Sequence, residues 1–357
     1  MTPKLSLVFP CYHAAQHMPH VLEDLQAQTF ADFEAILVND GDESQVEAME
    51  QIAAQDSRIR IVHRSENGGP SAARNSGTDA VNSPWVTYPD PDDRFGPDYA
   101  RSLFEAVNGP EGVEMACGGY TTVFVDRDQQ VSPPEFLSEN VEVLEMADAY
   151  GRLFNCEVKM LNYVWNGIYD VGVMRSNALR FDSGFLDCED VLFTLMYLQH
   201  VKHIGVFRDC GYVYYRKDYG GMTNCYNPRH LQNIREIADI RKAFHRRIGW
   251  QEPRTQKVWA DEMAYGVHTL FRNYFVDGCL TIREAVPKVQ TELLAMPEYT
   301  DAFLQKDFGK DRLLWIEQAL VRTGNAWLIV LCYKSMAFFK RHFGKLYSQL
   351  KPFIRGE

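Results

Sequence analysis

The first hundred residues alternate between short apolar runs and longer segments with helical spacing. Four apolar runs rich in β-branched and aromatic residues predict strands at residues 5–9, 33–38, 59–62 and 85–88. Apolar residues that recur three and four positions apart predict helices at residues 18–28, 46–54 and 71–81. Because strands alternate with helices, we expect an α/β fold with a mostly parallel sheet that helices cover on both faces.

Polar loops follow three of these predicted strands. Residues 10–13 come after the first strand, residues 39–41 after the second and residues 90–93 after the fourth. In a parallel sheet the carboxyl ends of the strands lie at one edge, and ligands bind there. We therefore expect the three loops to meet at one rim of the sheet.

The remainder of the chain is mixed and then helical. We expect strand and turn at residues 115–125, an irregular loop at 131–141, helices at 148–156 and 187–199, and a tyrosine-rich strand at 210–216. After about residue 223 strand signals fade, and helical spacing recurs at residues 231–247, 255–275, 282–294 and 312–322. The pattern predicts an α/β domain over residues 1–225 and a helical C-terminal region over residues 226–357.

Composition and charge narrow the class of protein. Among 357 residues, 46% are hydrophobic and 24% are charged, as in an ordinary globular protein. The 48 acidic residues outnumber the 37 basic ones, which argues against nucleic acid as a partner. The sequence shows no apolar run near the ~18 residues of a membrane span and no signal-peptide pattern at its start, so we expect a cytoplasmic protein. The eight cysteines are scattered, with no zinc-type pair, and are expected to be reduced thiols.

Three carboxylates lie close together in the sequence Asp90-Pro-Asp-Asp93. Like charges at this spacing repel each other unless a cation lies between them, and Mg²⁺ or Mn²⁺ prefers such oxygen ligands. Two prolines stiffen the loop that presents the carboxylates. The alternative is a solvated acidic turn, since Asp and Pro are both common in turns.

Other polar residues lie at strand ends and helix starts. Asp40 ends the second predicted strand, where a carboxylate can bind a base or ribose or can form a turn. Residues 67–77 place glycines before a helix that carries Arg74, and helix-start N–H groups and arginine both suit a diphosphate. Glu189 and Asp190 open another helix, where a carboxylate can act as a general base. The alternatives are a surface arginine and acidic residues that only stabilise the helix dipole.

Taken in this order, these segments resemble the family 2 glycosyltransferases, which have the Rossmann-like GT-A fold. The motifs that carry the resemblance lie at residues 10–13, 33–42, 67–77, 90–93, 189–190 and 212–216. Together they extend over about residues 4–223, and every fixed position of N-x-G-x-x-x-A-R-N-x-G is present. His13, Asp42 and Arg94 depart from the family pattern. The Q-x-x-R-W box and the membrane spans of processive members are missing from this sequence, which argues against a self-contained processive synthase.

The resemblance implies transfer of a sugar, with inversion, from a nucleotide diphosphate donor. It implies contacts to the nucleoside from Pro10, Tyr12, Glu34 and Asp40. It implies contacts along the rest of the donor from Asn67, Arg74, Asp90 and Arg216, with Lys217 as a further phosphate contact. It also implies that Asp92, with help from Asp90, binds Mg²⁺ or Mn²⁺. Asp190 would take the proton from the acceptor hydroxyl, and Glu189 is the lesser candidate for this role.

Two other functions share parts of this pattern. A nucleotidyltransferase also uses such a sheet, but its G-x-G-T-R-like loop should follow the first strand, where this chain has residues 10–13. A non-catalytic carbohydrate-binding or scaffold protein could keep the fold, although the metal and base candidates argue against it. For the enzyme we expect a UDP-linked hexose or N-acetylhexosamine as donor. The expected acceptor is a saccharide or a lipid-linked hydroxyl in cell-surface glycan synthesis.

The C-terminal tail combines apolar and basic residues. Residues 326–333 are all apolar, and from residue 310 to the end there are nine basic and three acidic residues. Further apolar residues recur at helical spacing, namely Met336, Phe339, Phe343, Tyr347, Leu350 and Ile354. Such a helix can lie on an anionic membrane surface, which would make the protein peripheral on the inner face of the cell membrane. The alternatives are a terminal helix docked on the protein and a helix that forms a homodimer.

Overall fold

The computed structural model describes residues 2–109, 112–125, 129–153, 160–185, 188–216, 226–250, 254–275, 280–309 and 311–342. The chain divides into two compact units, Met1–Asp218 and Tyr219–Glu357. Each unit has its own cluster of buried apolar side chains. The predicted boundary after residue 225 falls at the end of residues 217–225, which lie outside the described part, so it stays a prediction.

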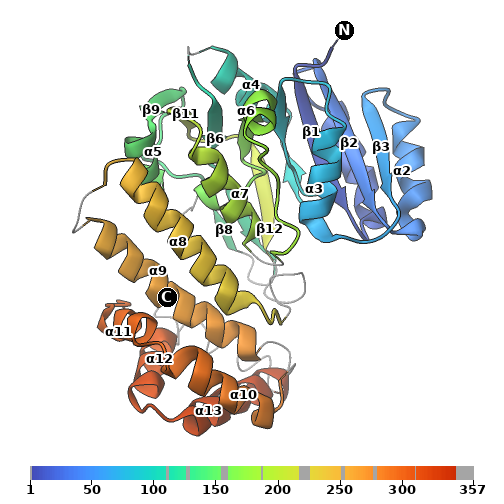
Figure 1. Ribbon diagram of the computed structural model, residues 1–357. Coiled ribbons are helices and arrows are strands. Elements are labelled where there is room, and N and C mark those ends of the chain that lie inside the picture. Colours follow the sequence, from blue (N-terminus) through green and yellow to red (C-terminus); the bar gives the residue numbers. More distant parts are fainter. Residues whose placement is uncertain are drawn as a thin grey trace. The chain divides into compact units, whose positions relative to one another are not determined.

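The first unit is built around an eight-stranded sheet with the strand order β3-β2-β1-β4-β10-β6-β11-β9 (Figure 1). Its strands are β1 (Leu5–Cys11), β2 (Phe33–Asp40), β3 (Ile59–Arg64), β4 (Trp85–Thr87), β6 (Met115–Gly118), β9 (Glu142–Glu145), β10 (Gly167–Asp170) and β11 (His203–Phe207). The strands β3, β2, β1 and β4 are parallel, whereas β10 is antiparallel to both of its neighbours and β9 is antiparallel to β11. The prediction of a mostly parallel sheet is confirmed.

Helices pack their apolar sides against this sheet. They are α1 (Met18–Gln26), α2 (Val46–Ala53), α3 (Gly69–Asp79), α4 (Tyr99–Asn108), α5 (Met146–Leu153), α6 (Val171–Ser176) and α7 (Glu189–Leu198). Figure 1 shows α3 lying across β1 and β2, and Gly77 of α3 lies against Val8 of β1. A Cβ atom at Gly77 would lie 2.3 Å from Cγ1 of Val8, so only glycine allows this packing. The helices predicted in the first hundred residues are confirmed, whereas α4 and α6 lie outside the predicted helices.

A second sheet in the same unit has the order β5-β12-β7-β8. Its strands are β5 (Arg94–Phe95), β7 (Thr121–Phe124), β8 (Gln129–Val131) and β12 (Tyr212–Arg216). Because β12 pairs with β5, the tyrosine-rich strand lies next to the segment that follows the acidic loop. The strands predicted at residues 115–125 and 210–216 are confirmed. The predicted helices at 148–156 and 187–199 correspond to α5 and α7, with residues 154–156 and 187 outside the described part.

The described residues of the second unit form helices and loops. The helices are α8 (His230–Arg247), α9 (Arg254–Phe275), α10 (Ile282–Lys288), the π-helix η6 (Val289–Leu294), α11 (Pro297–Gln305), α12 (Arg312–Arg322) and α13 (Ala326–His342). Pro287 lacks an N–H donor, and soon after it the chain continues as η6 rather than as the regular helix predicted over residues 282–294. Among the described helices, none is both long and apolar enough to cross a membrane.

Candidate active site

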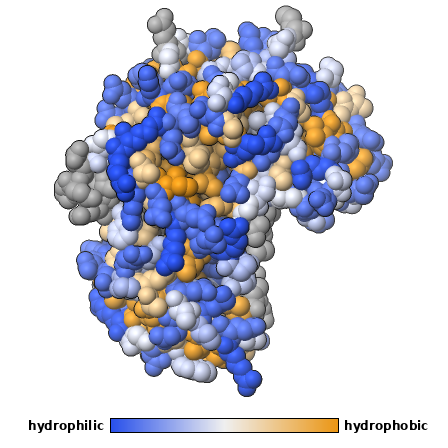
Figure 2. Space-filling model, in the orientation of Figure 1, coloured by the Kyte–Doolittle hydropathy of each residue, from blue (hydrophilic) through white to orange (hydrophobic). Residues whose placement is uncertain are grey.

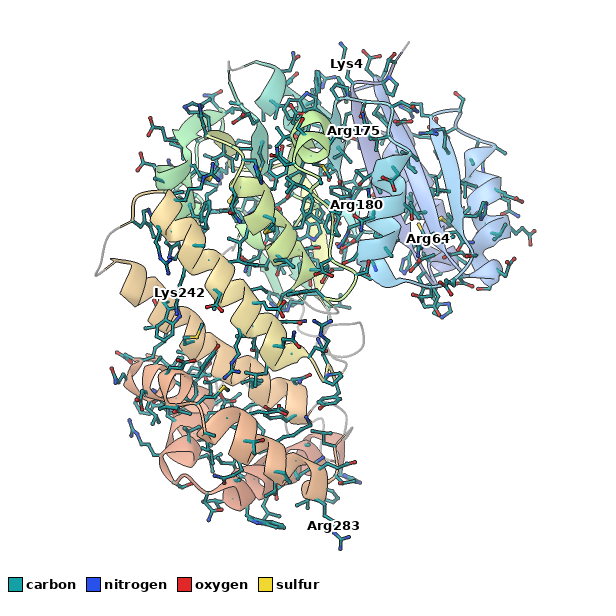
Figure 3. All side chains as sticks on the ribbon, in the orientation of Figure 1. Lys4, Arg64, Arg175, Arg180, Lys242 and Arg283 are labelled. Atoms are coloured by element: carbon teal, nitrogen blue, oxygen red, sulfur yellow. The ribbon has the colours of Figure 1, made fainter. Side chains whose placement is uncertain are left out.

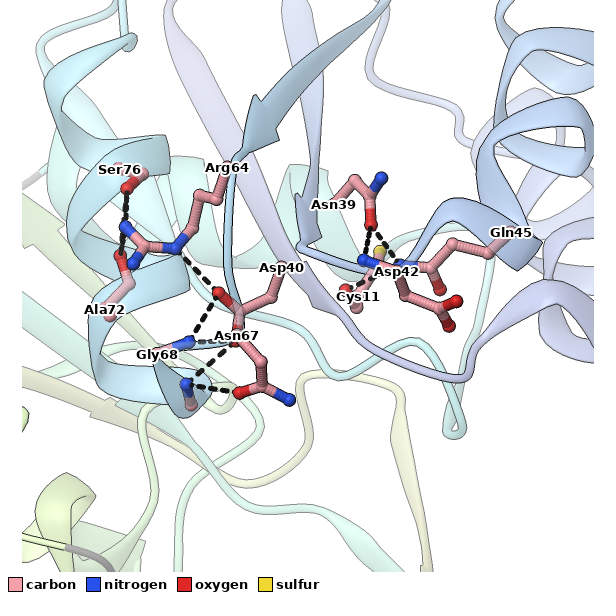
Figure 4. A network of polar contacts seen from close by, with 11 residues as sticks. Cys11, Asn39, Asp40, Asp42, Gln45, Arg64, Asn67, Gly68, Ala72 and Ser76 are labelled. Atoms are coloured by element: carbon pink, nitrogen blue, oxygen red, sulfur yellow. Dashed lines mark hydrogen bonds and ion pairs between the residues drawn. The ribbon is translucent and has the colours of Figure 1, made fainter.

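The loops after β1 and β2 are tied together at the carboxyl rim of the sheet (Figure 4). The side-chain amide of Gln45 donates to the carbonyl of Cys11 at 2.8 Å and to Oδ1 of Asn39 at 2.7 Å. Asp42 accepts a hydrogen bond from the backbone N–H of His13 at 3.0 Å and lies 2.9 Å from its Nδ1. His13 and Asp42 both depart from the family pattern, and the structure pairs them with each other.

Asp40 is the last residue of β2, is buried, and has its partners within the chain (Figure 4). Its carboxylate accepts hydrogen bonds from the N–H groups of Gly68 at 3.1 Å and Gly69 at 2.8 Å. It also pairs with Nε of Arg64 at 2.6 Å. The N–H groups at the start of α3 thus bond the chain's own carboxylate. The side chain of Asn67 also bonds within the same loop, since its Oδ1 accepts a hydrogen bond from the N–H of Gly69 at 2.9 Å. Donor contacts from Asp40 and Asn67 stay predictions.

Glu34 lies at the wrong end of its strand for a donor contact. It comes six residues before the rim residue Asp40, which is about 20 Å along a strand. Its oxygens accept hydrogen bonds from Ser6, from Arg60 and from the N–H of Asn82, each at 2.7 Å. The prediction that Glu34 holds the nucleoside is therefore wrong, because this residue joins segments at the amino edge of the sheet.

Three other predicted donor residues lie at or near the sheet ends. Pro10 is half-buried in β1. Tyr12 is exposed just after β1, and its ring centroid lies 4.0 Å from that of His13. Arg216 is exposed at the end of β12, with its guanidinium 5.7 Å from the ring of Phe124. Their contacts with the donor stay predictions, and Lys217 lies outside the described residues.

Arg74 of α3 lies among the carboxylates predicted to bind the donor and to activate the acceptor. Its Nη2 is 3.1 Å from Asp90, and its Nη1 is 2.6 Å from Asp190 and 3.2 Å from Glu189. Only 4% of the arginine side chain is exposed. The structure thus joins the glycine-rich segment, the acidic loop and the start of α7, which are separate candidates in the sequence.

Neighbouring contacts hold α3 and its arginine in place. The side chain of Asn75 donates to the carbonyl of Phe181 at 2.8 Å and accepts from its N–H at 3.0 Å. The ring of Phe181 lies 5.4 Å from the guanidinium of Arg74, within the range of a cation–π contact. Further along α3, Asp79 forms an ion pair at 2.7 Å with Arg180, which is labelled in Figure 3. In this motif Arg74 therefore pairs with the carboxylates, and Asn75 fixes the segment that carries Phe181.

Burial and mutual repulsion shape the protonation of this cluster. Burial lowers the pKa of Arg74, but the three carboxylates outweigh burial and raise that pKa above its ordinary value. Burial raises the pKa of Asp190 to about 8; Arg74 opposes this rise, and the other two carboxylates add to it. Burial also raises the pKa of Asp90, and the charge of Asp92 contributes. One guanidinium faces more negative charge than it can neutralise, which favours a further cation.

Tyr212 of β12 anchors the acidic loop. Its hydroxyl accepts from the N–H of Asp90 at 3.0 Å and donates to Asp93 at 2.8 Å. Asp93 is buried and also accepts from the N–H of Tyr215 at 2.8 Å. Tyr212 is therefore a positioning residue that sequence reasoning missed. Its place at the start of the Y-x-Y-R-like motif is the signal that points to it.

Contacts from α1 fix the other side of the same loop. Arg94 bonds both carboxylate oxygens of Asp24, at 2.6 and 2.8 Å. The ring nitrogen Nε2 of His20 lies 3.0 Å from the carbonyl of Pro91. An aromatic residue at position 94 could not form the pair with Asp24, so this departure from the family pattern comes with a local ion pair.

Asp90 and Asp92 offer oxygen ligands for a divalent cation. Asp92 is exposed, and Asp90 is partly exposed. Within the described part of the chain, no three His, Cys, Asp or Glu side chains form a group that could hold a metal ion. Mg²⁺ and Mn²⁺ take carboxylate oxygens and commonly complete their shell with substrate phosphates. The residues present therefore fit an ion that is shared with a diphosphate.

Cys188 sets the start of α7. It adopts a left-handed backbone conformation with φ of 61°, which is uncommon outside glycine. The helix begins at the next residue, so Glu189 and Asp190 occupy its first turn. Acidic residues there interact favourably with the helix dipole, and here they also bond Arg74. The sequence gives no signal for this turn, because cysteine has no preference for left-handed backbone.

Comparison with known proteins identifies the class. The profile of Glycosyl transferase family 2 matches residues 6–178. The chain is 28% identical over 252 residues to the uncharacterized glycosyltransferase EpsJ of Bacillus subtilis, over 70% of this chain and 72% of that protein. It is 27% identical over 208 residues to the teichoic acid poly(glycerol phosphate) polymerase of Staphylococcus epidermidis, over 57% of this chain and 27% of that protein. Over residues 6–178 the chain is therefore similar to the family 2 glycosyltransferases.

Solved structures agree at the level of the fold. The crystal structure of S. aureus TarS 1–349 in complex with UDP matches with a TM-score of 0.63 at 15% identity, over 93% of this chain and 91% of that chain. The complex of the same protein with UDP-GlcNAc matches with a TM-score of 0.56 at 16% identity, over the same shares. The fold is therefore the GT-A fold that the sequence motifs predict, with a helical C-terminal region.

Proposed function

We propose that this protein transfers a hexose or N-acetylhexosamine, with inversion, from a UDP-linked donor to a hydroxyl group of a saccharide or lipid-linked acceptor. The observation that carries the proposal is the buried cluster in which Arg74 joins Asp90 to Glu189 and Asp190. Asp90 belongs to the loop proposed to hold the donor diphosphate. Asp190 opens the helix proposed to face the acceptor. One guanidinium thus links the leaving-group side of a sugar transfer to its base.

In this mechanism Asp190 takes the proton of the acceptor hydroxyl while the hydroxyl oxygen attacks the anomeric carbon of the donor sugar. The bond from that carbon to the diphosphate breaks, and the nucleotide diphosphate leaves with the bonding electrons. Attack on the face opposite the leaving group inverts the anomeric carbon. Arg74, 2.6 Å from Asp190, holds the base in place and favours its ionised form.

We propose that Asp92 and Asp90 share Mg²⁺ or Mn²⁺ with the donor diphosphate. Such an ion would offset the charge of the leaving group. Two features support this role: Asp92 is exposed, and the pKa of Asp90 is raised by burial and by the charge of Asp92. Arg216, exposed at the end of β12, is proposed to contact the same phosphates.

The names of similar proteins support cell-surface glycan synthesis as the setting. One relative is a teichoic acid polymerase, and structures of TarS hold UDP or UDP-GlcNAc. From these we take a UDP-linked donor and a growing cell-surface glycan as acceptor. A lipid-linked acceptor would bring a cytoplasmic enzyme to the inner face of the membrane as a peripheral protein.

The test is a screen of UDP-linked sugars for hydrolysis in Mg²⁺, in Mn²⁺ and in chelator. We expect one UDP-hexose or UDP-N-acetylhexosamine to be hydrolysed with metal and not in chelator. Asp92→Asn should abolish this activity and weaken UDP binding, whereas Asp98→Asn, at another exposed carboxylate, should leave both unchanged. Full activity of Asp92→Asn in chelator would contradict the metal role.

The same screen separates the alternatives. A non-catalytic carbohydrate-binding or scaffold protein would bind a sugar and hydrolyse none of the donors. A nucleotidyltransferase would instead release pyrophosphate from a nucleoside triphosphate and a sugar phosphate. Either result would replace the proposed transfer reaction.

A further inference from the structure

One face of α13 packs into the core of the second unit. Ala326, Ile329 and Val330 are buried. Ile329 and Val330 come three and four positions after Ala326, so the three residues lie on the same side of the helix. The predicted alternative of a terminal helix docked on the protein is thus confirmed for this face. Met336 and Phe339, which the sequence pattern places on a membrane-facing stripe, are half-buried. The tail residues from 343 onward lie outside the described part.

The opposite face of α13 is apolar and exposed. Trp327, Leu328, Leu331 and Phe338 are 57%, 45%, 48% and 59% exposed. With Ser335 they form a stripe along one side of the helix, which we call the outer face of α13. Figure 2 shows apolar side chains in orange at the surface of this unit, among polar ones in blue. A single exposed apolar residue is ordinary, but a row of four on one helix marks an interaction surface.

Basic residues outnumber acidic ones along α12 and α13. Residues 312–342 contain five Lys and Arg residues and one acidic residue, Glu317. The carboxylate of Glu317 is buried and bonds His268 at 2.8 Å and the hydroxyl of Tyr333. Arg312 and Arg322 of α12 are exposed, and Lys334 of α13 is half-buried, where the charge of Glu284 on α10 interacts with it. The chain as a whole carries a net charge of -11, so this positive region is local.

We propose that the outer face of α13 docks on an anionic lipid bilayer, with its apolar side chains among the headgroups and the basic residues near the lipid phosphates. Helices with an apolar stripe and basic residues lie in the membrane interface in this way, and Trp is favoured there. A second copy of the chain fits less well, because two such faces would bring their positive charges together. This inference rests on the proposed function in one respect: docking would bring the enzyme to a lipid-linked acceptor. The docking itself is measured without donor or acceptor, so either proposal can fail alone.

The test is sedimentation of the full chain with vesicles of phosphatidylcholine, with and without phosphatidylglycerol. We expect binding to the anionic vesicles only, and high salt should weaken it. Leu331→Ser combined with Phe338→Ser should weaken binding about tenfold or more. Phe136→Ser changes an aromatic residue of the first unit that is 51% exposed, and it should leave binding unchanged. Unaltered thermal unfolding and donor hydrolysis show that the variants fold.

A second measurement leaves the outer face of α13 apolar. The fluorescence of Trp327, taken as the difference from Trp327→Phe, should be quenched by brominated lipids in anionic vesicles. Missing vesicle binding, missing quenching, or unchanged binding by the double variant overturns the proposal. A dimer that the double variant converts to a monomer also overturns it, since the face would then be a contact between copies.

Discussion

Arg74 determines how the donor loop and the base are held relative to each other. Its Nη atoms reach three carboxylates, while its buried Nε has no hydrogen-bond partner among the described residues. Burying a guanidinium is costly unless the charges around it compensate, and removing one partner of a buried pair exposes that cost. The arginine therefore stabilises the site only together with Asp90 and Asp190.

Arg74→Ala should leave three carboxylates without their shared cation. We expect a loss of about 3–5 kcal/mol in the free energy of unfolding. Donor hydrolysis should fall by about 10²-fold, because the base is no longer positioned. The control is Arg180→Ala, which breaks the exposed pair with Asp79 and should cost at most about 1 kcal/mol. Denaturant unfolding and the rate of donor hydrolysis measure both effects. If Arg74→Ala behaves like Arg180→Ala, the cluster does not organise the site.

The pH profile of donor hydrolysis should follow the ionisation of Asp190. A general base must be ionised, and burial raises the pKa of Asp190 to about 8. The rate should therefore rise about tenfold per pH unit below that value and level off above it. Because Glu189 adds to this raised pKa, Glu189→Gln should move the rise to lower pH. A profile that is flat between about pH 6 and 9, or one that Glu189→Gln leaves in place, would argue against Asp190 as the base.

Among the elements, the end of β2 organises the start of α3. Asp40 joins Arg64 to the N–H groups of Gly68 and Gly69, so the loop between them depends on one buried carboxylate. The acidic residue at the end of β2 thus has its partners within the chain.

Asp40→Ala should destabilise the first unit by about 3 kcal/mol, since the half-buried Arg64 and two N–H groups lose their acceptor. Asp79→Ala, which removes the exposed partner of Arg180, should stay within about 1 kcal/mol. Urea unfolding measures both. If Asp40→Ala is as stable as Asp79→Ala but binds UDP more weakly, Asp40 is a donor contact instead.

Elements with a repeating pattern can be predicted from this sequence, and short ones cannot. The first four strands and three helices follow from apolar residues at regular spacing. The strands β9 and β10 have four residues each and β5 has two, which is too few for a period to show. Their place is set by pairing with distant strands, and such pairing leaves no local signal.

Some residues of the candidate active site can likewise be predicted from the sequence, and others cannot. Linear motifs point to Arg74, Asp90 and the pair at the start of α7, and the structure brings these residues together. A motif does not say which end of a strand a residue occupies, which is why the prediction for Glu34 is wrong. Tyr212 lies 122 residues from Asp90 in sequence, and only the fold brings its hydroxyl to the acidic loop.

At the scale of the whole molecule, the described donor and base candidates all belong to the first unit. Ligand binding there should raise the temperature of unfolding by mass action. UDP with Mg²⁺ at about a hundred times its dissociation constant should add about 2.7 kcal/mol. Chelator, or Asp92→Asn, should remove most of this gain. A scanning calorimeter measures the shift, and equal stabilisation by UDP in chelator would contradict a metal shared with the diphosphate.

The central claim is that the cluster around Arg74 serves sugar transfer with Asp190 as its base. The most direct measurement is the rate of metal-dependent donor hydrolysis by Asp190→Asn at saturating donor, together with its affinity for UDP. We predict a rate loss of about 10²-fold or more with UDP affinity unchanged, because the base faces the acceptor rather than the nucleotide. An unchanged rate in Asp190→Asn would contradict the claim and would reduce Glu189 and Asp190 to the acidic first turn of a helix.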